Sequence, residues 1–136
     1  MTAADSVPVV PVVPVVLVVD DDDQICEVVR EALEPEGYAV WQAAHGEAAL
    51  DLLDERASAD GSAPAVILLD LHMPVMDGWR FAHEYRQRPV PLAALIAFTA
   101  SKIQGPVAGT AATIRKPFAV DELLDLVQRH APAPPT

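Results

Sequence analysis

Four side chains or clusters with complementary chemistry stand at or directly after apolar stretches of this chain. Residues 20–23 are all Asp, Asp70 follows a second apolar stretch, Thr99 ends a third, and Lys116 follows a fourth. Acids, one hydroxyl and one lysine at the ends of different strands are the groups that a metal-assisted phosphoryl-transfer site needs. Such a site forms only if the strands and helices of the fold bring these side chains together.

Strand-like and helix-like patterns alternate along the chain. Short β-branched or apolar runs predict strands over 15–19, 38–42, 65–69, 92–98 and 113–115. Apolar residues at helical spacing predict helices over 25–33 and 48–53, from about residue 79, and over 120–127. Asp22 or Asp23 is the expected N-cap of the first helix, Gly37 its expected end, and 58–64 an expected loop. Such alternation predicts an α/β doubly wound fold, with a parallel sheet covered on both faces.

The carboxyl ends of parallel strands meet at one edge of a sheet, so Asp20, Asp21, Asp70, Thr99 and Lys116 are expected there together. Two carboxylates about 4 Å apart repel by roughly 4 kcal/mol at an effective dielectric near 20. A hard divalent cation removes this repulsion, and Mg²⁺ prefers carboxylate and carbonyl oxygens. We therefore expect the acids and one loop carbonyl to bind Mg²⁺, with Asp70 as a nucleophile that forms an acyl phosphate.

The composition predicts a single cytoplasmic domain. The 136 residues suffice for one core, and the lone Cys26 cannot form an internal disulfide, which favours a reduced compartment. Neither an apolar run of membrane-spanning length nor a secretory leader pattern is present, so membrane insertion is not expected. The net charge of −11 disfavours direct binding to nucleic acid.

Proline-rich segments flank the expected domain at 15–130. Residues 1–14 begin with small polar residues and continue as Pro-Val-Val repeats, whose prolines at a period of three exclude a regular helix. We expect this segment to be extended, either as a disordered lead-in or lying along a hydrophobic groove. Residues 131–136 are also Pro-rich and are expected to be extended.

Four motifs occur in a characteristic order: Leu17-Val18-Val19-Asp20-Asp21, the run from Ile67 to Gly78, Thr99-Ala100-Ser101 and Lys116-Pro117-Phe118. Together they resemble the receiver domain of bacterial two-component response regulators, over about residues 15–130. The resemblance implies a flavodoxin-like fold with strand order 2-1-3-4-5. It also implies a stand-alone, phosphorylation-controlled switch that is not a conventional enzyme.

The resemblance assigns a role to each group of the site. Asp70 matches the phosphoacceptor, which receives its phosphoryl group from a histidine kinase or a histidine phosphotransfer protein. Asp20 and Asp21 match the acidic pair that binds Mg²⁺, with Asp21 the more direct ligand. The backbone carbonyl of His72 matches a further metal ligand. Thr99 and Lys116 match the switch hydroxyl and the family's lysine.

The chain departs from the family pattern near its expected output surface. Thr113 stands three positions before Lys116, where receivers usually carry an aromatic switch residue. The interval between Thr99 and Lys116 is a few residues short, so the fourth helix, expected over 102–109, is predicted to be shortened. The downstream protein and the oligomeric state are therefore left open, with output expected in trans through protein contacts or phosphorelay.

Two alternatives use the same residues. A pseudo-receiver would keep the fold and use its acidic face as a scaffold without phosphorylation, which the substitution at Thr113 favours. A Mg²⁺-dependent phosphatase would use Asp70 as nucleophile but would need a second acid close by, often two residues later, where His72 stands.

Overall fold

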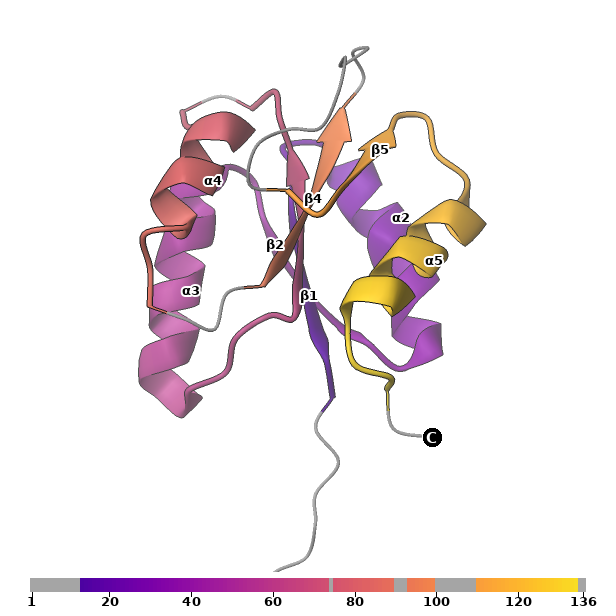
Figure 1. Ribbon diagram of the computed structural model, residues 1–136, viewed down its shortest axis with the longest axis horizontal. Coiled ribbons are helices and arrows are strands. Elements are labelled where there is room, and N and C mark those ends of the chain that lie inside the picture. Colours follow the sequence, from indigo (N-terminus) through magenta and orange to yellow (C-terminus); the bar gives the residue numbers. More distant parts are fainter. Residues whose placement is uncertain (1–12, 74, 90–92, 100–109, 135–136) are drawn as a thin grey trace, which may run out of the picture.

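A central parallel sheet organises the molecule. The computed structural model describes residues 13–73, 75–89, 93–99 and 110–134. Its strands are β1 (Val15–Val19), β2 (Ala39–Ala43), β3 (Val66–Asp70), β4 (Ala94–Thr99) and β5 (Ala112–Arg115). They pair in parallel in the order β2-β1-β3-β4-β5 (Figure 1). The predicted α/β doubly wound fold and its strand order are confirmed.

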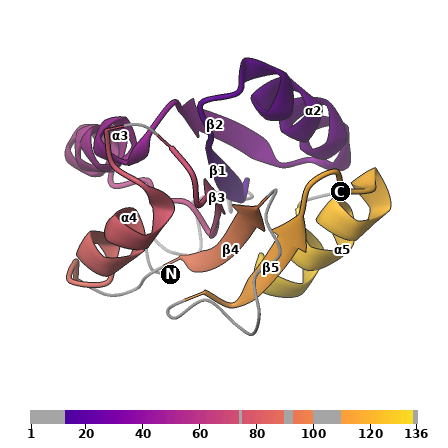
Figure 2. The same ribbon diagram turned by 90° about the horizontal axis from the view of Figure 1, so that it is seen from above.

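Helices cover both faces of this sheet. They are α2 (Asp23–Leu33), the 3₁₀ turn η1 (Glu34–Glu36), α3 (Gly46–Asp60), α4 (Gly78–Tyr85) and α5 (Val120–His130). Helices α2 and α5 lie on one face, and α3 and α4 lie on the other (Figure 2). Each pair of helices packs on its own half of the hydrophobic core, so the sheet is buried on both sides.

The alternation of side chains along β1 divides its residues between the two halves of the core. Val16 and Val18 pack in the cluster beneath α2 and α5, whereas Leu17 and Val19 pack in the cluster beneath α3 and α4. Successive side chains of a strand point to opposite faces, which is why a strand at the centre of this sheet is apolar throughout. The buried strands thereby hold their carboxyl ends in a fixed arrangement.

The ends of the helices follow local capping chemistry. The side chain of Asp22 accepts a hydrogen bond from the Gln24 amide, which confirms Asp22 as the N-cap of α2. The helix itself ends at Leu33, and Gly37 instead caps η1 with a φ of 100°. The loop expected from residue 58 was wrong at its start, because α3 continues to Asp60 before Gly61 caps it at a φ of 74°.

Strands β2 and β3 each begin and end one residue later than expected. As a result, Asp70 is the last residue of β3 and pairs in register with Phe98 of β4, so it belongs to the sheet itself. The described part of β4 begins at Ala94 and ends at Thr99.

The predicted shortened helix over 102–109 and the Pro-Val-Val repeats before residue 13 lie outside the described residues. No helix in the described part of the chain is long and apolar enough to cross a membrane.

Candidate functional site

Buried polar side chains gather at the carboxyl edge of the sheet. Among the described residues, those buried and polar are Asp20, Asp70 and Thr99, with exposed fractions of 1%, 6% and 2%. They follow or end β1, β3 and β4, so three separate strands deliver them to the same edge. Burying a charge is costly unless it is paired, so this concentration marks a site rather than ordinary surface.

Lys116 connects two of these carboxylates. Its Nζ lies 2.7 Å from Asp20 Oδ2 and 3.6 Å from Asp70 Oδ2. The Lys116 amide donates a hydrogen bond to the Thr99 carbonyl at 2.7 Å, and the peptide bond to Pro117 is cis. The Lys116 ammonium therefore points into the acidic cluster from the end of β5.

The three acids expected to bind a metal lie close together. Carboxylate oxygens of Asp20, Asp21 and Asp70 all lie within 4.8 Å of one another. Asp20 and Asp70 are buried, and Asp21 is exposed to solvent. With Lys116 as one opposing positive charge, three ionised carboxylates leave an excess of negative charge. Hard oxygen ligands with that charge fit a divalent cation such as Mg²⁺.

The loop after β3 orients the Asp70 carboxylate. The backbone amide of His72 donates a hydrogen bond to Asp70 Oδ1 at 3.0 Å, while Oδ2 faces Lys116. The two oxygens of Asp70 therefore have different environments. The assignment of the His72 carbonyl as a metal ligand stays a prediction.

Burial and pairing shift the proton affinities of the central ion pair. Burial raises the pKa of Asp20, although the hydrogen bond from Lys116 opposes this. Burial lowers the pKa of Lys116, but its hydrogen bond and attraction to Asp20, together with the charge of Asp70, outweigh this and leave the pKa above its usual value. Lys116 is therefore charged at neutral pH, while the ionised form of Asp20 is held at a net cost.

We expect Asp20→Asn to raise the thermal stability of the cation-free protein by a few degrees and to weaken Mg²⁺ binding. Between the ordinary Asp pKa of about 3.9 and the raised pKa of Asp20, the folded protein binds more protons than the unfolded chain. The free energy of unfolding therefore rises as the pH falls through this range. Asp20→Asn removes the net cost and this part of the pH dependence, and Lys116 is not left unpaired, because the Asp70 carboxylate still lies 3.6 Å from its ammonium. Thermal melts with EDTA at several pH values, and titrations with Mg²⁺, measure both effects.

Asp21→Asn is the matched control for this prediction, because Asp21 is the exposed member of the cluster. It should lower the affinity for Mg²⁺ with little change in the melting temperature under EDTA. A lower melting temperature for Asp20→Asn than for wild type under EDTA would contradict the assigned cost of burying that carboxylate.

Two contacts in the site were not anticipated from the sequence. A Cβ atom at Gly78 would lie 2.6 Å from the Asp70 carbonyl oxygen and 2.7 Å from Leu71 Cα, so only glycine lets α4 begin this close to the strand end. The buried Cys26 thiol donates to the Asp20 carbonyl oxygen at 3.6 Å. The Asp-Gly pair at 77–78 was a visible signal for the first contact, whereas nothing in the sequence indicated the second.

Comparison with known proteins identifies the family. The family model described as the response regulator receiver domain matches residues 16–128. The chain belongs to this family. The receiver domain is 35% identical over 112 residues to Response regulator MprA of Mycolicibacterium vanbaalenii, covering 79% of this chain and 46% of that protein. It is 35% identical over 118 residues to the DNA-binding dual master transcriptional regulator RpaA of Synechocystis sp., covering 82% of this chain and 46% of that protein. The chain thus spans about half the length of these curated relatives.

Solved structures agree with this membership. Chemotaxis response regulator CheY4 of Vibrio cholerae superposes with a TM-score of 0.73 at 31% identity, covering 87% of this chain and 98% of that one. The response regulator TrrA from Thermotoga maritima, in complex with Mg(2+)-BeF, gives a TM-score of 0.69 at 28% identity, covering 85% and 97%. The receiver domain is accordingly a module of phosphorylation-dependent two-component signalling, and it is a signalling domain rather than a classical enzyme.

Proposed function

We propose that this receiver accepts a phosphoryl group onto Asp70 from a histidine kinase or a histidine phosphotransfer protein, and passes the signal to another protein. The observation that carries the proposal is the position of the Asp70 carboxylate. It is held by the His72 amide at one oxygen, lies 3.6 Å from the Lys116 ammonium at the other, and is clustered with the carboxylates of Asp20 and Asp21.

The chemistry follows from this arrangement. A carboxylate oxygen of Asp70 attacks the phosphorus of a phosphohistidine, a new P–O bond forms, and the P–N bond breaks with its electron pair returning to the imidazole. The charge on the transferring group spreads over its oxygens, so positioned positive charge and hydrogen-bond donors stabilise it. Lys116 supplies a partly buried positive charge beside Asp70, and it stays protonated because its pKa lies above the usual value.

Mg²⁺ is the metal proposed for the acidic cluster. Asp20, Asp21, Asp70 and the carbonyl of His72 would hold the ion. When bound, it would supply positive charge between the carboxylates and the phosphoryl oxygens. The clustered carboxylate oxygens support this assignment, and so does the complex of the related TrrA with Mg(2+)-BeF.

Thr99 is the proposed link between phosphorylation and output. It is buried at the end of β4, one residue beyond Phe98, which pairs with Asp70. We infer that the Thr99 hydroxyl moves toward the phosphoryl group and donates a hydrogen bond to it. This movement shifts the segment that follows Thr99. Thr113 is exposed on β5 and has no aromatic ring, so the rotation of an aromatic side chain at that position is either absent from this receiver or replaced by a smaller change.

The partners follow from the same chemistry. We propose a sensor histidine kinase or phosphotransfer protein upstream, an unidentified protein downstream, and a cytoplasmic setting in which both occur. The receiver carries an excess of acidic residues, which disfavours direct contact between this domain and nucleic acid. The DNA-binding activity named for RpaA belongs to a protein of which the matched region is 46%.

Incubation with Mg²⁺ and acetyl phosphate, followed by intact mass measurement, tests the proposal. We expect one added phosphoryl group, and no adduct when EDTA replaces Mg²⁺. Acetyl phosphate serves because it carries an activated phosphoryl group and needs no cognate kinase. A folded sample that gains no phosphoryl group under any of these conditions would favour the pseudo-receiver alternative, and capture of constitutive partners would follow.

A further inference from the structure

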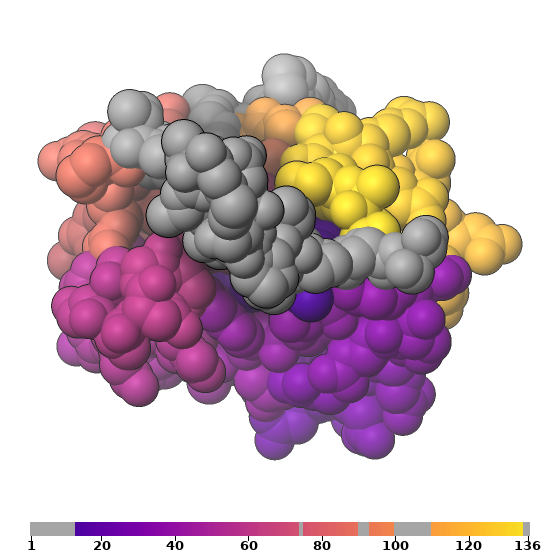
Figure 3. Space-filling model, turned by 90° about the horizontal axis from the view of Figure 1, so that it is seen from below, coloured from indigo at the N-terminus to yellow at the C-terminus, as the bar shows by residue number. Residues whose placement is uncertain are grey.

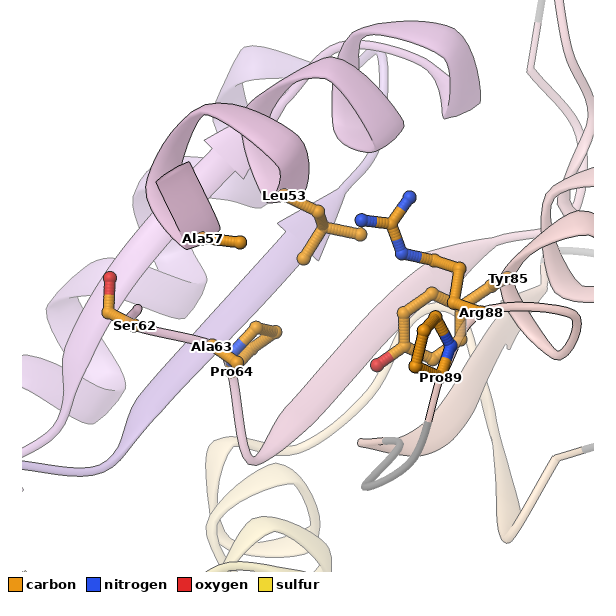
Figure 4. Close-up of a pocket in the computed structure, with 8 residues that line it drawn as sticks. All are labelled: Leu53, Ala57, Ser62, Ala63, Pro64, Tyr85, Arg88 and Pro89. Atoms are coloured by element: carbon orange, nitrogen blue, oxygen red, sulfur yellow. The ribbon is translucent and has the colours of Figure 1, made fainter. Parts of the chain in front are cut away.

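A pocket of about 280 Å³ opens at the amino edge of the sheet, away from Asp70. Leu53 and Ala57 of α3 form one wall, Pro64 lies just before β3, and Tyr85 and Pro89 close the other side (Figure 4). Helices α3 and α4 therefore border the pocket on the side of the sheet opposite α2 and α5, and Figure 3 views the molecule from this edge.

Two polar side chains of the pocket already have partners, whereas the buried hydroxyl of Ser62 accepts or donates no hydrogen bond among the described residues. The Tyr85 hydroxyl accepts a hydrogen bond from the Ala93 amide at 2.8 Å, and Arg88 forms an ion pair with Asp54. What the pocket offers to a ligand is therefore mainly the ring of Tyr85 and apolar side chains from both helices. Apolar walls with an aromatic ring and paired charges fit an uncharged, apolar segment better than an anion.

The chain enters the sheet next to this pocket. The Val15 carbonyl accepts a hydrogen bond from the Ala65 amide at 2.8 Å, and Ala65 directly follows Pro64 of the pocket wall. Strands β1 and β3 are neighbours, so the start of β1 lies about 4.8 Å from the strand that the pocket borders. Residues that precede β1 therefore begin within short reach of the pocket.

The side chains of β1 alternate between the two faces of the sheet, one of which carries the pocket. Leu17 and Val19 belong to the core cluster that contains Leu53 and Tyr85, so odd-numbered residues of β1 face α3 and α4. Val13 lies two residues before β1 and is 46% exposed. An apolar side chain at the start of the sheet thus remains without full cover.

The sequence before Val13 has the chemistry that such a pocket binds. Residues 7–13 read Val-Pro-Val-Val-Pro-Val-Val and carry no charge. Prolines three residues apart favour an extended polyproline II helix, which rises about 3.1 Å per residue, so six residues reach about 19 Å. Extended proline-containing segments characteristically bind grooves lined by aromatic rings.

We propose that residues 7–13 of this chain bind intramolecularly in the pocket between α3 and α4. Because the segment is tethered, its effective concentration is in the millimolar range, and weak apolar contacts suffice. The pocket lies at the opposite edge of the sheet from the phosphoacceptor, so this contact is independent of the proposed phosphoryl chemistry.

Paramagnetic relaxation in the chain of 136 residues tests the proposal. A nitroxide is attached at Ser6→Cys, and the native Cys26 stays unlabelled because it is buried and its pKa is raised to about 11. We expect strong broadening of the Ala63 and Arg88 amide signals, and none at Val28 on α2. Equal broadening on both faces of the sheet would overturn the proposal.

A pair of exposed alanines on α3 supplies matched variants. Ala57→Glu places a charge on the pocket wall, whereas Ala59→Glu places the same charge on the same helix away from the lining. The broadening should be lost in the first variant and kept in the second, and the same result in both would contradict binding in the pocket. Mixing spin-labelled protein with isotope-labelled protein should transfer no broadening. Transfer would show that a second copy supplies the segment and would overturn the intramolecular contact.

Discussion

Asp70→Asn is expected to abolish phosphoryl uptake completely while the protein stays folded. The substitution removes the nucleophilic oxygen, because an amide does not form an acyl phosphate under these conditions. The amide oxygen of Asn can still accept the hydrogen bond that the His72 amide donates to Asp70 Oδ1. One negative charge disappears from a cluster with an acidic excess, so the melting temperature without Mg²⁺ should be unchanged or higher.

Intact mass after treatment with Mg²⁺ and acetyl phosphate measures this loss directly. Asp51→Asn is the matched control, since Asp51 is an exposed carboxylate of α3 outside the site and its loss should leave the adduct in full yield. An adduct that persists on the Asp70→Asn protein would place the phosphoacceptor elsewhere. Peptide mapping of that adduct would then identify the residue.

Lys116→Ala is expected to destabilise the cation-free protein by about 3 kcal/mol, because removing the cation that pairs with a buried carboxylate leaves that negative charge uncompensated. The Asp20 carboxylate is fully buried and receives its hydrogen bond from Lys116 at 2.7 Å. Added Mg²⁺ should restore more stability to the variant than to wild type, since the cation takes over neutralisation of the carboxylates. Thermal or denaturant unfolding with EDTA and with Mg²⁺ measures the difference.

The raised pKa of Lys116 predicts that the folded protein loses stability at alkaline pH. Its stabilising contribution is fully present below the ordinary lysine pKa of about 10.4 and is lost as the pH rises through the higher folded-state value. Wild type should therefore lose stability in that range, whereas Lys116→Ala should lack this component. Arg115→Ala is the matched control, because Arg115 is an exposed cation at the end of β5, directly before Lys116.

The Lys116→Ala protein also tests how the signal leaves the site. We expect it to bind Mg²⁺ but to show a much smaller change in amide hydrogen exchange on phosphorylation than wild type. The ammonium is the group that joins the carboxylate cluster to the end of β5, so its removal separates the phosphoryl group from that strand. A variant that responds like wild type would show that Lys116 has no part in transmission.

The sequence predicted the elements well wherever local patterns are strong. Apolar runs identified all five strands, and Asp22 was one of the two expected N-caps, because burial on both faces and capping depend on neighbouring residues. The end of α3 was missed, since Ser58 to Asp60 resemble a loop in composition and only Gly61 supplies the left-handed cap. The segment over 102–109 stays a prediction.

For the site, the sequence by itself determined which groups reach the carboxyl edge of the sheet, because the ends of parallel strands must lie together. The tertiary structure decided how these groups are paired. Lys116 and Asp20 are 96 residues apart in the chain, and their 2.7 Å contact depends on strand register and on the turn after β5. The same holds for the close approach of Gly78 to Asp70, for the exposure of Asp21 beside the buried Asp20, and for the pocket between α3 and α4. Distances between strands and helices that are remote in sequence arise from packing, and no local pattern encodes them.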